Sequence, residues 1–120
     1  PQYIAIKPNN KVAYISTPSN SVIYQVNLNK RRPVFPPISL TPNLPDSYGS
    51  EDVAITPNGS TLYVSLSNSG DPTAPGLVIP VDVKDSKAPV VKAPIIVGAS
   101  PLGITVAPKL AASKKKKTCL

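Results

Sequence analysis

The stretch VAITPNGSTLYVS, residues 53–65, reads as an apolar run, a turn and a second apolar run. Asn and Gly in the turn tolerate positive φ, so the pattern predicts an antiparallel β-hairpin. Nearly the same phrase, IAIKPNNKVAYIS, stands at residues 4–16, and its beginning returns as GITVAPK at residues 103–109. The chain is therefore built on an internal repeat, from which the fold can be inferred.

The repeat extends to two further predicted strands in each unit. SVIYQVNL at residues 21–28 matches GLVIPVDV at 76–83, and VFPPISL at 34–40 matches VKAPIIV at 91–97. Each complete unit therefore holds four short strands. The insertions that distinguish the two units fall between these strands, where loops tolerate them.

Individual positions of the repeat have roles that their residue types predict. Asn27 and Asp82 align, and we expect both side chains to cap the turn after the third strand. Pro80 lies within a predicted strand, which requires that its missing amide faces no partner or lies at a bulge. The other aligned structural positions are Pro8, Asn9, Tyr14, Pro57, Asn58, Gly59, Tyr63 and Pro108.

The composition agrees with an all-β fold. Sixteen prolines among 120 residues disfavour long helices, because proline lacks the amide hydrogen and clashes with the preceding turn. Four short antiparallel strands, repeated with a period of about 50 residues, are typical of a β-propeller in which each unit is one blade. We expect an incomplete propeller segment: a first blade at residues 1–49, a second at 50–100, the first strand of a third at 101–108, and a disordered basic tail at 109–120.

The hairpin AITPNGSTLYVS resembles the YVTN-type β-propeller repeat, in which a short aliphatic strand, Pro-Asp/Asn-Gly and an LYV-type strand follow one another. The resemblance covers residues 1–108. It implies a propeller with more blades than this chain holds, in a secreted, periplasmic or cell-surface protein. The chain departs from that family where Ser16-Thr17 and Ser65-Leu66 replace the asparagine that usually closes the LYV strand.

The chain begins at Pro1 without a signal-peptide pattern, so we expect a processed or excised segment.

The residues that usually carry catalysis are sparse. The chain has no histidine, which removes the commonest general base and metal ligand. Glu51 and Asp52 are adjacent, but neighbours on a strand point to opposite faces and would not converge on one metal ion. The polar loop at residues 65–76 lacks the regular acidic spacing of a calcium loop, and Asn58-Gly59-Ser60 is explained by a tight turn without a glycan. We therefore predict no catalytic, cofactor-binding or metal-binding residues.

The positive charge is concentrated near the end of the chain. Thirteen Lys and Arg stand against six Asp and Glu, and four of the seven net charges come from Lys114, Lys115, Lys116 and Lys117. This lysine run is a candidate for weak contact with an anionic membrane surface, whereas we expect no nucleic-acid partner. Prenylation would require a cysteine fourth from the end, and Cys119 is second from the end. We favour the other interpretation, which is an unstructured terminus such as a cloning or reading-frame scar.

Two classes of function remain open. The first is a non-enzymatic repeat segment that serves as a structural or binding surface for a protein, glycan or cell-wall ligand. The second is a fragment of a lactonase-like or dehydrogenase-like propeller enzyme whose catalytic residues lie in other blades. The lack of histidine and of clustered charge favours the first.

An isolated pair of blades would leave two sheet faces uncovered. We expect Ile4, Ile6, Val22 and Val26 to contribute to one exposed apolar surface, and Val78, Ile79 and Val81 to the other. Such surfaces usually mark an interface. We therefore expect the chain to associate with the remaining propeller blades or with further copies of itself.

Overall fold

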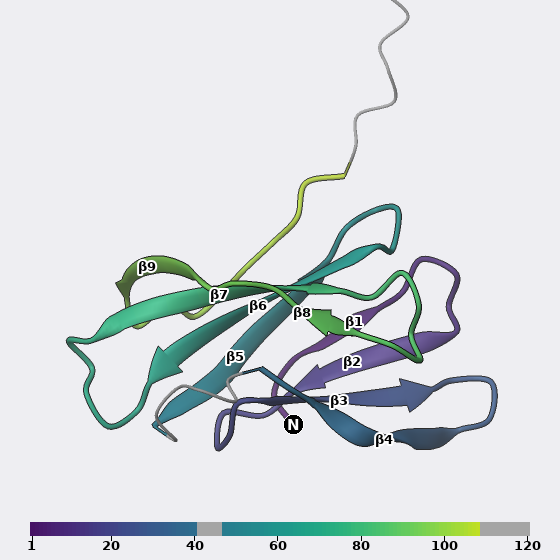
Figure 1. Cartoon of the computed structure of the whole chain (residues 1–120), viewed down its shortest axis with the longest axis horizontal. Coiled ribbons are helices and arrows are strands. Elements are labelled where there is room, and N and C mark those ends of the chain that lie inside the picture. Colours follow the sequence, from purple (N-terminus) through teal and green to yellow (C-terminus); the bar gives the residue numbers. More distant parts are fainter. Residues whose placement is uncertain (41–46, 109–120) are drawn as a thin grey trace, which may run out of the picture.

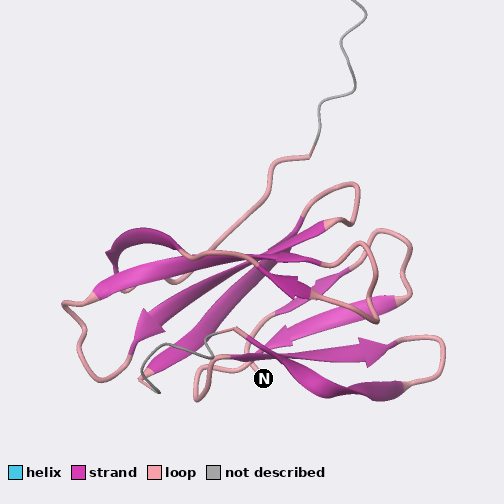
Figure 2. Ribbon diagram, in the orientation of Figure 1, coloured by secondary structure: helices cyan, strands magenta, loops and turns pink. Residues whose placement is uncertain are grey.

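The computed structural model describes residues 1–40 and 47–108, which consist of strands and loops without a helix (Figures 1 and 2). The N-terminal sheet contains β1 (Ile4–Ile6), β2 (Val12–Ser16), β3 (Val22–Asn27) and β4 (Arg32–Ser39), paired antiparallel in that order. The C-terminal sheet contains β5 (Tyr48–Ile55), β6 (Thr61–Asn68), β7 (Pro75–Asp82), β8 (Val90–Val91) and β9 (Ile95–Ala99). The prediction of an all-β chain with antiparallel sheets is confirmed, and the described residues form two open sheets rather than a closed ring.

The repeated hairpin has the same register in both sheets. Ala5 pairs with Tyr14 between β1 and β2, and Ala54 pairs with Tyr63 between β5 and β6. Tyr14 and Tyr63 thus occupy equivalent register positions in the two hairpins. Since paired residues of neighbouring strands share a face, each tyrosine covers the small alanine of its own hairpin.

The turns of the two hairpins use positive φ, as their residues predict. Asn10 has a φ of 58° and Gly59 a φ of 71°. In the second turn the Asn58 side-chain oxygen accepts hydrogen bonds from the Ser60 amide at 3.0 Å and from the Thr56 hydroxyl at 2.7 Å. These contacts close the tight turn from within.

The outer strand of the C-terminal sheet is divided in two. β7 pairs with β8 at Val81 and Asp82, and with β9 between Pro75 and Val78, so β8 and β9 together take the place of one strand. The predicted four strands of this unit are therefore five. Residues 92–94 interrupt the ladder, and Pro94 has no amide to donate to β7.

Pro80 lies opposite this interruption. Its carbonyl oxygen accepts a hydrogen bond from the Lys92 amide at 2.8 Å, so the missing Pro80 amide faces the same gap. The corresponding part of the N-terminal sheet also shifts register, between Ile23 and Gln25 of β3. Pro80 therefore satisfies the condition that its position in a strand imposed.

β4 is an edge strand rich in proline. It contains Pro33, Pro36 and Pro37, and the Phe35–Pro36 peptide bond is cis. Each proline removes a backbone donor from the strand. The fourth strands of both sheets are thus the ones in which proline interrupts the regular hydrogen-bonding pattern.

The two sheets pack face to face around one core. β5 contacts β1, β2 and β3 across the interface (Figure 1). We call the face that each sheet turns to the other its inner face and the opposite one its outer face. The inner face of the N-terminal sheet includes Val12, Tyr14, Ile23 and Ile38, and that of the C-terminal sheet includes Val53, Leu62, Val64, Leu66, Ile79 and Val81.

The prediction that Ile79 and Val81 would be exposed is wrong. Their side chains are 1% and 0% exposed, because both positions point to the N-terminal sheet. Side chains alternate along β7, so Val78 and Pro80 lie on the outer face instead. Alternate side chains of this apolar strand therefore lie on the covered inner face and on the outer face.

Candidate functional site

A buried serine ends the second strand of the N-terminal sheet and joins the two sheets. The Ser16 hydroxyl accepts a hydrogen bond from the Tyr3 amide at 3.3 Å and donates one to the Glu51 carbonyl oxygen at 2.9 Å. Tyr3 precedes β1, whereas Glu51 lies on β5. One side chain thus connects the beginning of its own sheet with the first strand of the next.

Ser65 repeats this arrangement at the same position of the C-terminal sheet. Its hydroxyl accepts from the Asp52 amide at 3.2 Å and donates to the Leu102 carbonyl oxygen at 3.1 Å. The Asp52 carboxylate also accepts a hydrogen bond from the Ile104 amide at 3.0 Å. The segment after β9 is therefore held against the C-terminal sheet by a contact equivalent to the one that holds β5.

Residues 101–108 have no strand assignment in the structure. Their prediction as the first strand of a third blade stays a prediction, as do the blade boundaries. The predicted basic tail at 109–120, with Lys114 to Lys117, lies outside the described residues, and so does most of the insertion before β5.

The start of β5 approaches the β2–β3 loop very closely. The Ser50 hydroxyl accepts a hydrogen bond from the Thr17 amide at 3.0 Å and donates to the Thr17 carbonyl oxygen at 3.0 Å. A Cβ atom at Gly49 would lie 2.0 Å from the Pro18 carbonyl oxygen. Glycine is therefore required here for the two sheets to dock.

Lys7 is a buried cation that bridges the sheets at another point. Its side-chain ammonium donates to the Val83 carbonyl oxygen at 2.6 Å and to the Ser86 hydroxyl at 3.1 Å. It lies in the turn after β1, and its partners lie in the loop after β7. Sequence reasoning did not identify Lys7, whose counterpart in the second hairpin is Thr56.

Tyr14 is fully buried on the inner face of the N-terminal sheet. Its hydroxyl has no hydrogen bond of normal geometry. Burial raises the pKa of Tyr14 above its ordinary value, and the neighbouring Ser86 hydroxyl offsets part of that rise. The phenol is therefore held in its neutral form.

The outer faces carry many apolar side chains. On the N-terminal sheet this face comprises Ile4, Ile6, Ile15, Val22, Tyr24 and Val26, and on the C-terminal sheet Ala54, Tyr63, Val78, Pro80 and Ile95. Ile4 and Ile95 are 58% and 50% exposed. These two faces are the candidate interaction surfaces of the chain.

The two adjacent carboxylates serve as hydrogen-bond acceptors in separate places. Glu51 accepts from the Ser67 hydroxyl on β6. Asp52 accepts from the Val53 amide at 2.7 Å as well as from Ile104. Within residues 1–40 and 47–108 no group of three or more His, Cys, Asp or Glu side chains is arranged to hold a metal ion.

The polar loop before β7 uses its oxygen atoms in its own turns. The Asn68 side-chain oxygen accepts from the Gly70 and Asp71 amides, both at 3.0 Å. Asp71 accepts from the Thr73 hydroxyl at 2.7 Å and from the Thr73 amide at 2.9 Å, and these bonds hold its pKa below the ordinary value. The loop is thus organised by hydrogen bonds to side chains.

The aligned turn residues make similar local contacts in both sheets. The Asn27 side chain accepts from the Lys30 amide at 2.9 Å, and Asp82 accepts from the Lys84 amide at 3.0 Å. Asn9 accepts from the Lys11 amide at 2.9 Å in the first hairpin turn. These side chains stabilise turns next to strand ends.

The fold and these contacts define an all-β protein of two stacked antiparallel sheets. Comparison with models of known protein families finds no match, and comparison with curated protein sequences finds none either. In the part of the chain that the structure describes, no helix has the length and apolar character to cross a membrane.

Proposed function

We propose that the chain is a non-enzymatic β-propeller repeat segment that acts as a structural scaffold and binding surface. The observation that carries this proposal is the repeated serine contact: Ser16 holds the first strand of the following sheet, and Ser65 holds residues 102–104 in the same way. Repetition of one contact along the chain favours a structure that grows by adding equivalent units.

The outer faces are suited to receive such units. Ile15 on one outer face corresponds to Val64 on the C-terminal inner face, and Tyr63 on the other corresponds to Tyr14 on the N-terminal inner face. The two outer faces therefore correspond to the two inner faces that already pack together. The outer face of one chain should thus fit the opposite outer face of another. Burial of apolar area stabilises by about 25 cal/mol per Å², so covering these faces favours association.

The partner of each outer face is a neighbouring propeller blade or a further copy of the chain. The resemblance to YVTN-type repeats supports a location outside the cytoplasm and a protein, glycan or cell-wall ligand for the completed assembly. The lysine-rich tail would add a weak contact with anionic membrane surfaces.

Sedimentation of the purified chain tests this proposal. Head-to-tail association joins two different faces, so we expect Ile15→Glu and Tyr63→Glu each to abolish self-association at micromolar concentration. An equimolar mixture of the two variants should form a one-to-one dimer, because each supplies the face that the other has lost. Asn29→Glu, in an exposed turn, is the control and should associate like the parent chain.

Two results would contradict the proposal. One is a parent chain that stays monomeric at high micromolar concentration and binds no hydrophobic dye. The other is a mixture of the two variants that remains monomeric although the parent chain associates, because that outcome excludes head-to-tail contact.

A further inference from the structure

A cavity of about 280 Å³ opens between strands β3 and β4 of the N-terminal sheet and the loop that leads to β8. Its apolar walls are formed by Val34, Phe35, Pro36, Pro37, Pro89 and Val91. Gln25 on β3 contributes a polar group, and so do Ser86 and Lys87 in the loop after β7. Both sheets thus supply walls, so the cavity exists because the sheets are docked.

Gln25 lines the cavity and carries an unpaired acceptor. The residue is 3% exposed, and its side-chain oxygen is buried without a hydrogen-bond partner. Its β-ladder partner is Tyr14, which places Gln25 on the inner face. A buried amide oxygen without a donor is unfavourable, so a ligand that brings an N–H or O–H group would satisfy it.

The walls favour a flat ring over a sugar or an extended peptide. Proline rings and the Phe35 side chain, which is 72% exposed, offer apolar surfaces for stacking. A sugar would need partners for several hydroxyl groups, whereas apart from Gln25 the polar lining consists of Ser39, Ser86 and Lys87, and Ser86 already accepts a hydrogen bond from Lys7. Addition of a peptide strand to β4 is disfavoured by its three prolines.

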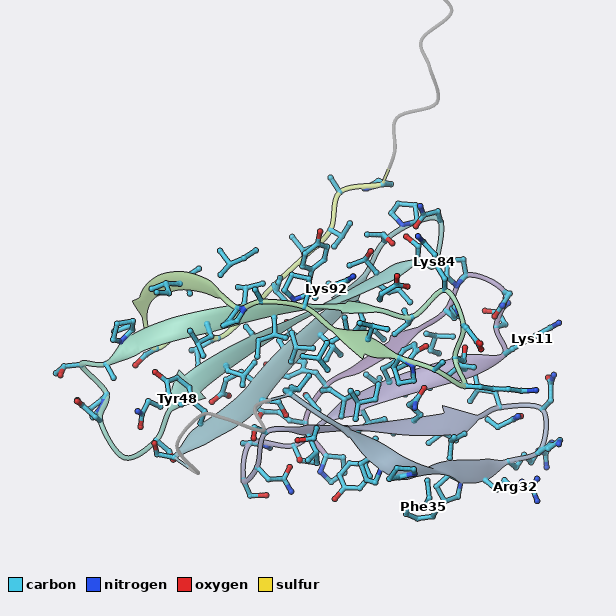
Figure 3. All side chains as sticks on the ribbon, in the orientation of Figure 1. Lys11, Arg32, Phe35, Tyr48, Lys84 and Lys92 are labelled. Carbon is cyan, nitrogen blue, oxygen red and sulfur yellow. The ribbon has the colours of Figure 1, made fainter. Side chains whose placement is uncertain are left out.

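We propose that this cavity binds an aromatic ring with a single N–H or O–H donor, such as an indole or a phenol. The donor pairs with the Gln25 side-chain oxygen, and the ring lies between the prolines and Phe35, which extends from β4 at the edge of the molecule (Figure 3). The volume is near the lower end for ligand pockets and suits one small ring system. Because one chain supplies every wall, the proposal does not rest on association between chains.

Titration with indole provides the first test. The chain contains no tryptophan, so indole fluorescence can be excited without a background from the protein. We expect saturable binding of indole, and binding at least about tenfold weaker for 1-methylindole, which keeps the ring and lacks the donor. Absence of saturable binding by both indole and phenol, or equal affinity for indole and 1-methylindole, would overturn the proposal.

Variants locate the binding. Gln25→Leu should remove the preference for indole over 1-methylindole, and its unfolding curve shows whether the fold is kept. Phe35→Ala alters an exposed side chain and should weaken both ligands, whereas Tyr3→Ala, an exposed aromatic outside the cavity, should change neither. Indole binding unaffected by both cavity variants would place the ligand elsewhere and refute the assignment.

A tripeptide Ala-Trp-Ala distinguishes two sources of the ring. Binding of the tripeptide with an affinity similar to that of indole supports the side chain of a protein partner. Binding of indole with exclusion of the tripeptide supports a free small molecule. Both outcomes support the shared chemistry, provided that Gln25→Leu abolishes the discrimination against 1-methylindole.

Discussion

Tyr14 and Tyr63 occupy the same position of the repeated hairpin, but their surroundings differ. Tyr14 is fully buried between the sheets, whereas Tyr63 is partly exposed on the outer face of the C-terminal sheet. The other face of each hairpin shows the reverse. There Val53 of the second hairpin is buried at 6% exposure, whereas its counterpart Ile4 of the first hairpin is 58% exposed. The repeated phrase thus determines the hairpin and its register, while the neighbouring sheet determines which of its side chains become core.

The largest expected effect is a difference in stability between a substitution on a covered sheet face and one on the corresponding uncovered face. Ile79→Ala removes a side chain from the covered inner face of the C-terminal sheet, and we expect it to lower the free energy of unfolding by about 2–5 kcal/mol. Ile4→Ala alters the equivalent but uncovered face of the N-terminal sheet and should change stability by less than about 0.5 kcal/mol. Urea denaturation of both variants measures the difference. Equal losses would show that the N-terminal outer face is covered in solution.

A smaller effect is expected where the sheets approach most closely. Gly49→Ala places a methyl group against the Pro18 carbonyl oxygen and should cost about 1–3 kcal/mol, because backbone must move to accommodate it. Gly98→Ala is the matched control, since a Cβ atom there meets nothing within 4 Å. We expect this control to stay within about 0.5 kcal/mol of the parent chain. A neutral Gly49→Ala variant in thermal unfolding would contradict the observed docking of the sheets.

The smallest expected effect is a pH dependence of stability that arises from the buried Tyr14. Burial raises the pKa of Tyr14 in the folded chain, so the folded state keeps a proton that the unfolded state releases. This stabilisation is complete below the ordinary tyrosine pKa of about 10 and declines as the pH rises above it. Denaturation between pH 8 and pH 11 should show a fall in the free energy of unfolding that Tyr14→Phe reduces. An unchanged fall in Tyr14→Phe would assign the effect to other groups.

Much of the fold could be predicted because its signals are local. The Asn10 and Gly59 turns, the register of the two hairpins and the placement of Pro80 at a break in the ladder depend on residues close together in the sequence. The division of β8 from β9 was not predicted, although Pro94 is a signal for it.

The contacts between the sheets could not be derived in the same way. Ile79 and Val81 were expected to be exposed because their strand is apolar throughout, and its alternation does not reveal which face a second sheet covers. The bridging role of Ser16 is weakly indicated by the sequence, because Ser65 occupies the same position of the repeat. Lys7 and Gln25 have none, because their burial depends on loops and strands far away in the chain.

The prolines of β4 have a consequence for how copies of this chain can aggregate. Amyloid fibrils extend when a strand edge recruits identical strands through its backbone N–H and C=O groups. Pro33, Pro36 and Pro37 remove three backbone donors from the edge strand β4, and Pro89 and Pro94 flank the short strands β8 and β9 at the far edge of the other sheet. Cross-β extension from these edges is therefore obstructed, whereas the proposed stacking of the apolar outer faces does not use them.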